Sequence, residues 1–332
     1  MATIKDVAKE AGVSVATVSR VLNNTANANP ETRASVQKAM QKLGYRPNAN
    51  ARALVSQTTN TIGVLIGDVS DPFYGSMVKA IDSIAIQHGK YLLIGNGYHN
   101  ASFEREVLEL LISSRCESLV VHSKALSNEE LIEFAREVPS MVLINRYIPE
   151  LAERCIALDN YRGSYQATEF LIKNGHRNIG YICSNHDIED TVHRKQGYLD
   201  AMQANHLDVD ENHIEYGSPT EKGGEEAMVN LLSKNLQLSA IACYNDYMAA
   251  GAMSVLDENG ITIPGEISLI GFDDGIIAKY LRPKLTTIRY PIQMMTEKAV
   301  KLALKLANKE PIEDDIRVFV PTMVRRDSVI KR

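Results

Sequence analysis

Three short amphipathic segments open the chain, each bounded by glycine or by a polar capping residue. Their apolar side chains recur at the three- and four-residue spacing of a helix: Ile4, Val7, Ala8 and Ala11, then Val15, Val18, Val21 and Leu22, then Ala34, Val36, Ala39, Met40 and Leu43. Thr3 and Asp6 predict a capping box, while Gly12 and Ser14 mark the turn to the second segment. Two short helices joined by such a turn predict a helix-turn-helix, followed by a third helix from Asn29-Pro30 to Gly44.

From Thr61 onward, apolar runs of strand length alternate with helical segments. The predicted strands are 61–67, 91–95, 118–122, 141–145, 178–183, 239–244 and 266–271, and the predicted helices lie near 74–88, 102–114, 128–136, 161–174, 190–204, 221–233 and 246–258. This alternation predicts parallel sheets with right-handed crossovers. The expected fold class is therefore an all-α headpiece followed by an α/β core.

Charge divides the chain at the same place. Residues 1–59 carry eight basic and three acidic side chains, a net charge of +5, so a total of −5 leaves −10 for the remainder. A basic module on an acidic body suits a phosphate-binding head, because the body then avoids nonspecific adhesion to nucleic acid. We predict a DNA-binding domain over 1–46, a hinge helix and linker over 47–60, and a ligand-binding core over 61–332.

The composition of the chain argues against a membrane protein, a disulfide-bonded protein and a cysteine metal site. No stretch approaches the roughly 18 apolar residues of a membrane span, and no apolar run follows a basic start, so we expect a cytoplasmic protein without membrane contact. The cysteines lie far apart and never as C-x-x-C, which favours buried free thiols over disulfides or a metal site. Those cysteines are Cys116, Cys155, Cys183 and Cys243.

The second helix of a helix-turn-helix enters the major groove, where its early outward side chains meet base edges. Here these are Val15, Ala16, Thr17, Ser19 and Arg20. Arg20 can donate two hydrogen bonds to guanine, and Val15 or Ala16 can pack against a thymine methyl group. The alternative is that Val15 belongs to the core and Arg20 is a solvated charge, but the complete motif favours base reading.

The headpiece resembles that of the lactose/galactose repressor family, through Thr3–Ala8, Gly12–Ser14, Thr17–Asn23 and Tyr45–Asn48. Val15-Ala16 and the run 48–54 are similar to the galactose regulators within that family. The resemblance implies dimers on a near-palindromic operator, with Leu54 intercalating from a hinge helix. The predicted DNA-contacting residues are Thr3, Ser14, Val15, Ala16, Thr17, Ser19, Arg20, Asn23, Asn48, Ala51 and Leu54.

Polar residues follow the predicted strands, where parallel sheets bind ligands. They are Asp68, Ser70, Asp71, Pro72, Phe73, Asn96, His99, His122, Asn145, Arg146, Asn185, Arg194, Asn245, Asp246, Asp273 and Asp274. Carboxylates, amides, an arginine and an aromatic face suit a sugar, because planar groups bond hydroxyl pairs. Alternatively, Asp71 and Asp246 act only as helix N-caps.

The region from Thr61 also resembles the family's periplasmic-binding-protein-like core. The resemblance implies two doubly wound parallel-sheet subdomains, one over 61–158 and 291–320 and the other over 159–289 and 321–332. They would be joined by crossings near 158–160, 287–291 and 320–322, with a long helix over 291–308. The implied ligand residues are Asp71, Phe73, Asn145, Arg146, Arg194, Asn245 and Asp273, with Phe73 packed on the sugar ring.

One feature departs from the family. The lactose-type repressor places a tryptophan against its ligand, whereas this chain contains no tryptophan and has Gly217-Ser218-Pro219 there. The sequence therefore does not identify the aromatic platform of the pocket.

The chain also ends at Val329-Ile330-Lys331-Arg332 without the leucine heptad that the lactose-type repressor carries for tetramers, and we therefore expect a homodimer.

The features of the chain predict a ligand-responsive repressor with no cofactor, metal or catalytic activity, and the resemblance to the galactose regulators implies that it acts on galactose transport and utilisation genes. It would bind a palindromic double-stranded operator as a dimer and be released by D-galactose as effector. The alternatives are a repressor that answers another sugar or a purine, and a sugar-binding protein without a role in transcription. An enzyme is disfavoured, because Gly95-Asn96-Gly97 is an incomplete dinucleotide fingerprint with Asn100 at the third glycine position.

Overall fold

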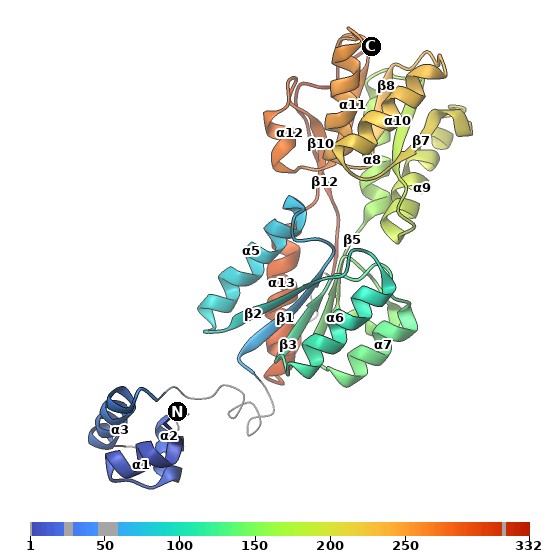
Figure 1. Ribbon diagram of the computed structural model, residues 1–332. Helices are drawn as coiled ribbons and strands as arrows, with labels where there is room; N and C mark the ends of the chain where they lie inside the picture. Colours follow the sequence, from blue (N-terminus) through green and yellow to red (C-terminus); the bar gives the residue numbers. More distant parts are fainter. Residues whose placement is uncertain (1, 23–28, 46–58, 314–316) are drawn as a thin grey trace. The chain divides into compact units, whose positions relative to one another are not determined.

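The computed structural model describes residues 2–22, 29–45, 59–313 and 317–332 (Figure 1). It divides the chain into two compact units, Met1–Thr59 and Asn60–Arg332. Most of the predicted hinge helix and linker lies outside the described residues, as do four of the predicted DNA contacts, Asn23, Asn48, Ala51 and Leu54.

The headpiece is a three-helix unit, and the predicted helix-turn-helix is confirmed. Its helices are α1 (Ile4–Ala11), α2 (Val15–Leu22) and α3 (Pro30–Leu43). The Thr3–Asp6 capping box is present, and Gly12 ends α1 at φ 67°, a left-handed conformation that glycine adopts without steric cost. Val7, Val18 and Val36 are fully buried in a small core that all three helices share.

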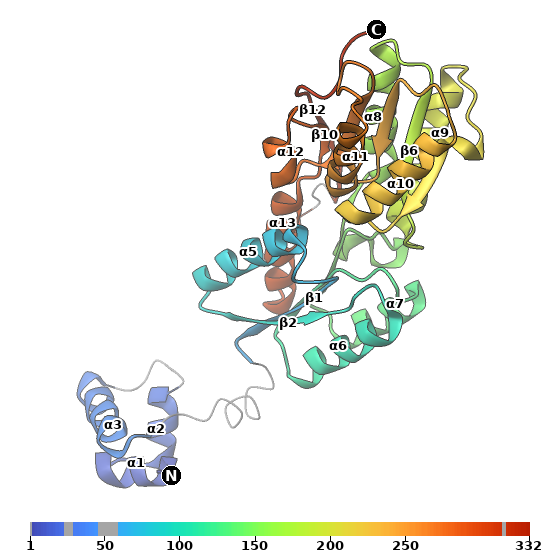
Figure 2. The ribbon, with the colours of Figure 1, turned by 45° about the horizontal axis from the view of Figure 1, so that its top comes forward.

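The N-terminal subdomain of the core is a six-stranded sheet in the order β11-β5-β4-β3-β1-β2, all parallel. Its elements are β1 (Thr61–Ile66), α5 (Pro72–Gln87), β2 (Tyr91–Asn96), α6 (Ala101–Ser113), β3 (Ser118–Val121), α7 (Asn128–Glu137), β4 (Met141–Ile144), η1 (Pro149–Arg154), β5 (Cys155–Leu158), α13 (Ile292–Ala307) and β11 (Val318–Phe319). Helices α5 and α13 cover one face, and α6 and α7 cover the other (Figure 2).

The C-terminal subdomain repeats this plan in the order β12-β10-β9-β8-β6-β7. Its elements are α8 (Asn160–Lys173), β6 (Ile179–Ser184), α9 (Glu189–Ala204), η2 (Glu211–His213), β7 (Ile214–Gly217), α10 (Glu221–Ser233), β8 (Ala240–Cys243), α11 (Asp246–Glu258), β9 (Ser268–Asp273), α12 (Ile276–Tyr280), β10 (Thr286–Arg289) and β12 (Thr322–Val324). Helices α8 and α9 cover one face and α10 and α11 the other, and only the edge strand β12 is antiparallel among the described strands. The predicted fold class is confirmed.

The chain passes between the two sheets three times. It leaves β5 for α8 at Asp159, leaves β10 for α13 at Tyr290-Pro291, and leaves β11 for β12 at Val320-Pro321. In both sheets the strand order reverses beside the first strand, so the carboxyl ends of neighbouring strands form a crevice. The two crevices belong to one core, and the pocket lies between them.

Several strands escaped the sequence prediction. β5, β7 and β10 are only four residues long, β7 contains Glu215, and β10 begins with two threonines whose buried hydroxyls are hydrogen bonded. The strand predicted at 266–271 is Ser268–Asp273 in the structure, so Asp273 is the last residue of the strand.

All four cysteines are free, but Cys116 is half-buried, so the prediction that it is buried is wrong. Among the described residues, no helix is both long enough and apolar enough to span a membrane.

Candidate ligand pocket and DNA-reading helix

Helix α2 presents a compact set of side chains for base reading. Val15 is 41% exposed, so its interpretation as a core residue is wrong, and Ala16 and Arg20 are exposed as well. Thr17 and Ser19, on the same helix, are half-buried. The small apolar and basic side chains thus lie on the outer surface of the second helix, where a major-groove reader needs them.

Two other predicted DNA contacts also stabilise the local fold. The Ser14 hydroxyl accepts a hydrogen bond from the backbone N–H of Thr17 at 3.1 Å, which caps α2. The Thr3 side chain and backbone both donate to the Asp6 carboxylate at 2.8 Å. The Ser14 oxygen accepts in its cap, so its proton can still be donated to a phosphate, whereas the Thr3 hydroxyl proton is committed to Asp6.

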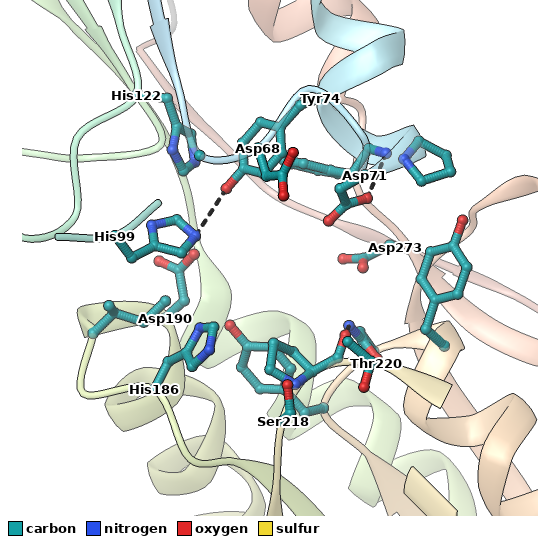
Figure 3. Close-up of a pocket in the computed structure, with 18 of the residues that line it drawn as sticks. Asp68, Asp71, Tyr74, His99, His122, His186, Asp190, Ser218, Thr220 and Asp273 are labelled. Atoms are coloured by element: carbon teal, nitrogen blue, oxygen red, sulfur yellow. Dashed lines mark hydrogen bonds between the residues drawn. The ribbon is translucent and has the colours of Figure 1, made fainter. Parts of the chain in front are cut away.

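A pocket of about 590 Å³ lies between the carboxyl ends of the two sheets. It takes residues from the N-terminal subdomain, including Asp68, Ser70, Asp71, Pro72, Phe73, Tyr74, Tyr98, His99, His122 and Asn145, and from the C-terminal subdomain, including His186, Asp190, Arg194, Ser218, Pro219, Thr220, Glu221, Tyr244, Asn245, Tyr247 and Asp273, with Tyr290 at a crossing. This volume lies within the range of small-molecule sites. His99, His122, His186 and Asp190 gather on one side of the cavity and Asp71 and Asp273 on another (Figure 3).

Arg194 is the most firmly held polar side chain of the pocket. Its Nε donates to Asn160 Oδ1 at 2.8 Å, and its Nη1 donates to the Tyr244 carbonyl at 2.7 Å. The guanidinium carbon stands 3.7 Å from the Phe272 ring centroid, and Nη2 lies 3.6 Å from Asp273 Oδ1. A buried guanidinium fixed in this way keeps donors aimed at one position, as recognition of a hydroxyl pair requires.

Asp273 and Asn245 stand beside Arg194. Asp273 adopts φ 110° at the end of β9, and its burial raises the pKa of the carboxyl to about 7 despite the opposing charge of Arg194. Asn245 caps α11 by accepting from the Met248 N–H at 2.8 Å, and its Nδ2 donates to the Pro219 carbonyl. The predicted Asp246 N-cap is therefore wrong. Asp246 instead accepts from Thr287 Oγ1 and from the Gly275 N–H.

The other subdomain contributes Asp71 and an aromatic cluster. Asp71 is both the N-cap of α5, accepting from the Phe73 N–H at 2.8 Å, and a pocket residue, so its two interpretations are compatible. Phe73 packs edge to face against Tyr74 and Tyr290, each at a centroid distance of 5.1 Å. Phe73 is thus held rigidly at the pocket wall, with Tyr290 beside it on the crossing between the sheets.

Three histidines form the remaining wall. His99 accepts or donates a hydrogen bond with the Tyr74 hydroxyl at 3.2 Å, and its ring centroid lies 6.1 Å from that of His122 and 5.6 Å from that of His186. Burial lowers the pKa of all three imidazoles, most strongly for His122. They are therefore neutral near pH 7 and can each donate or accept one hydrogen bond from a hydroxyl.

Four buried polar atoms of the pocket have no hydrogen-bond partner among the residues that the structure describes. They are His99 Nδ1, His122 Nδ1, Asn145 Oδ1 and the Tyr290 hydroxyl. A buried polar group without a partner is costly, so each of these atoms is suited to a ligand or an ordered water. Among the described residues, no three histidine, cysteine or acidic side chains are arranged to hold a metal ion.

One predicted ligand residue lies elsewhere. Arg146 does not line the pocket, because its guanidinium turns into the N-terminal subdomain and donates to the Ser123 carbonyl and to Asn128 Oδ1. It supports the loop after β3 instead. Asn145, its neighbour, does reach the pocket at φ 56°.

Several residues that line the pocket were not among the predicted ligand residues. Tyr74, His186, Asp190, Tyr244 and Tyr290 all contribute to the pocket. Tyr244 and Tyr290 directly follow strands, but tyrosine after an apolar run reads as strand continuation. Asp190 lies four residues before Arg194 on α9, the spacing that puts two side chains on one helix face, and this signal was available.

A helix-turn-helix headpiece joined to a two-subdomain core with a polar pocket between the sheets defines a ligand-regulated DNA-binding protein. A model described as bacterial regulatory proteins, lacI family, matches residues 3–48, and one described as a periplasmic binding protein-like domain matches residues 168–329. The HTH-type transcriptional regulator GalR of Escherichia coli K12 is 54% identical over 329 residues, which are 99% of this chain and 96% of that protein. GalS of Salmonella typhimurium LT2, named in the same way, is also 54% identical, over 100% and 98% of the two chains.

Solved structures agree on the fold. The complex of the transcriptional regulator CelR with cellobiose has a TM-score of 0.71 at 27% identity and covers 99% of this chain and 100% of its own. The Lac repressor dimer bound to operator and the anti-inducer ONPF has a TM-score of 0.86 at 23% identity, covering 99% of each chain. The chain belongs to the lacI family of bacterial regulatory proteins. It is a DNA-binding transcription regulator and not an enzyme.

Proposed function

We propose that this protein represses genes of galactose transport and utilisation. It binds a palindromic operator as a homodimer, and D-galactose releases it by binding between the two subdomains. The observation that carries the proposal is the combination, in one chain, of exposed Val15 and Ala16 on the reading helix with the Arg194–Asp273–Asn245 cluster in the pocket.

The charge of the pocket supports a neutral sugar as the effector. Five acidic side chains line it, Asp68, Asp71, Asp190, Glu221 and the partly protonated Asp273, against the single guanidinium of Arg194. A phosphorylated or otherwise anionic ligand would meet repulsion from these groups. A neutral polyol instead finds acceptors for its hydroxyl protons and, in Arg194 and Asn245, donors for its oxygen atoms.

Phe73 supports a pyranose in particular. It stands at the wall of the pocket, where the apolar C–H face of a sugar ring can pack on it. The choice of D-galactose among the neutral sugars rests on the likeness of Val15-Ala16 and the run 48–54 to the galactose regulators of the family.

Operator binding under added sugars tests this function. Fluorescence anisotropy of a labelled palindromic galactose-type operator duplex, at fixed salt, would be recorded with D-galactose, D-glucose, D-ribose or no sugar. We expect tight binding that only D-galactose releases. Binding that no sugar affects would reject the effector and keep the DNA-binding class.

Two variants separate the functions of the two units. Deletion of residues 1–59, a compact unit of its own, should abolish operator binding and leave D-galactose binding to the core intact. Arg194→Met should leave operator binding intact and prevent release by D-galactose. Loss of both activities in the deletion variant would count against this division of labour.

A further inference from the structure

A buried ion pair joins the two subdomains directly beside the pocket. Lys124, in the loop after β3, donates from Nζ to Asp190 Oδ1 at 2.7 Å, and Asp190 belongs to α9 of the other subdomain. Asn145, after β4, donates from Nδ2 to Asp190 Oδ2 at 2.7 Å. We name Lys124, Asn145 and Asp190 the cross-subdomain clasp.

The clasp is shielded from water. The side chain of Lys124 is 1% exposed and that of Asp190 is 10% exposed. Burial alone would raise the pKa of Asp190, but the charges of Lys124 and Arg194 outweigh it and lower that pKa. The Asp190 carboxylate is therefore ionised near neutral pH, and its buried contact with Lys124 is little screened by salt.

Lys124 is held in place before it reaches across the cleft. The carboxylate of Glu104, itself buried, accepts from the backbone N–H groups of Lys124 and Leu126, each at 3.1 Å, and from the Ser123 hydroxyl. Lys124 Nζ also donates to the Asn145 carbonyl. These bonds fix the loop to α6, so the ammonium group has one defined position.

Asp190 and Asn145 also line the pocket, while Lys124 does not. Asp190 Oδ1 accepts from Lys124 and, at 3.3 Å, from Asn160 Nδ2 of its own subdomain, while Oδ2 accepts from Asn145. Both acceptor sites of Oδ1 are thus occupied, and a sugar hydroxyl that donates to Oδ1 competes with the Lys124 bond that joins the subdomains. Ligand binding and the integrity of the clasp are linked by this shared carboxylate.

We propose that Lys124 is a regulatory positioning residue, which stabilises the operator-binding arrangement of the subdomains through its ion pair with Asp190. D-galactose opposes this pair when it binds. The inference rests on the proposed function for the identity of the effector, but the effect of Lys124 on operator affinity can be measured without any sugar.

The test is Lys124→Met in the full-length protein, which removes the charge and retains the length of the side chain. D-galactose affinity would be measured by calorimetry without DNA, and operator affinity by anisotropy without sugar. We expect D-galactose to bind about two- to thirtyfold more tightly and the operator at least about twofold more weakly. Opposite signs are required, since the two ligands favour opposite arrangements.

The matched control is Lys234→Met, which breaks a partly buried ion pair with Glu215 inside the C-terminal subdomain, at 2.5 Å in the wild type. It should change neither affinity. If circular dichroism shows that Lys124→Met does not fold, Lys124→Gln keeps a donor for Asp190 without the charge and should give the same signs with smaller changes.

Other outcomes overturn the proposal. Weaker D-galactose binding with unchanged operator affinity would make Lys124 a support of the pocket alone, and no change in either would make the pair inert. If wild-type protein fails to bind D-galactose, the proposed effector is wrong, and operator affinity alone then decides. A loss of operator affinity in Lys124→Met but not in Lys234→Met would support the clasp, and equal operator affinities of the two variants would reject it.

Discussion

Asp273 gives the sharpest link between the geometry of the pocket and a measurable free energy. Burial raises the pKa of its carboxyl to about 7, from an ordinary value of 3.8, although Arg194 Nη2 lies 3.6 Å away. The folded protein therefore binds a proton at Asp273 more readily than the unfolded chain between these two pH values. Over that window the free energy of unfolding falls as the pH rises, by up to about 1.4 kcal/mol per pH unit from this group.

Asp273→Asn removes this dependence. The asparagine keeps the shape of the side chain and tolerates the left-handed φ of 110° at this position. Integrated from pH 5 to pH 8, the ionisation of Asp273 costs the wild type about 2–3 kcal/mol of unfolding free energy, which the variant does not lose. We expect the variant to gain stability relative to the wild type by this amount, mostly between pH 5 and pH 7.

Urea unfolding of the core, followed by circular dichroism at pH 5, 6, 7 and 8, measures the difference. Asp208→Asn serves as the control, because it replaces an exposed aspartate of the same subdomain. Parallel stability profiles for the wild type and Asp273→Asn would show that Asp273 titrates as an ordinary exposed carboxyl, and the account of its burial would be refuted.

Three further substitutions test other parts of the structure. Arg20→Ala should weaken specific operator binding by about 1–3 kcal/mol and leave binding to a scrambled duplex nearly unchanged, as compared by anisotropy at fixed salt. Gly12→Ala should destabilise the headpiece by about 1–2 kcal/mol in thermal melts, because alanine is strained at the φ of 67° found there. Gly197→Ala places a Cβ 2.3 Å from the Tyr161 carbonyl oxygen, so it should separate α8 from α9 and lower core stability by about 1–3 kcal/mol; an unchanged melting temperature would contradict this packing.

Local signals in the sequence were sufficient for the headpiece. The Thr3–Asp6 capping box, the Ser14 cap and the glycines at 12 and 44 each act within one turn of the chain, so their chemistry can be read directly. In the core, long apolar strands such as β1 and β6 were predictable for the same reason. The short strands β7 and β10 were not, because Glu215 and the buried threonines owe their places to neighbouring strands.

The pocket was predictable only where one rule applied. Residues after strands, such as Asp71, Asn145 and Asn245, follow from the geometry of parallel sheets. The same rule wrongly included Arg146, because adjacent residues point in different directions as the chain leaves β4. Asp190 escaped it, since it enters the pocket from the first turn of α9 and its partner Lys124 is 66 residues away.

The aromatic wall of the pocket depends on a contact between distant parts of the chain. Phe73 from α5 lines the pocket and is held edge to face by Tyr290 on the crossing from β10 to α13. That contact joins positions more than two hundred residues apart, which no local pattern reveals. Tyr290 lies between the two sheets, so under the proposed function a sugar that packs on Phe73 also meets the crossing that joins the subdomains. The proposed recognition of the ligand and the contact between the subdomains would then share side chains at Tyr290, as proposed at Asp190.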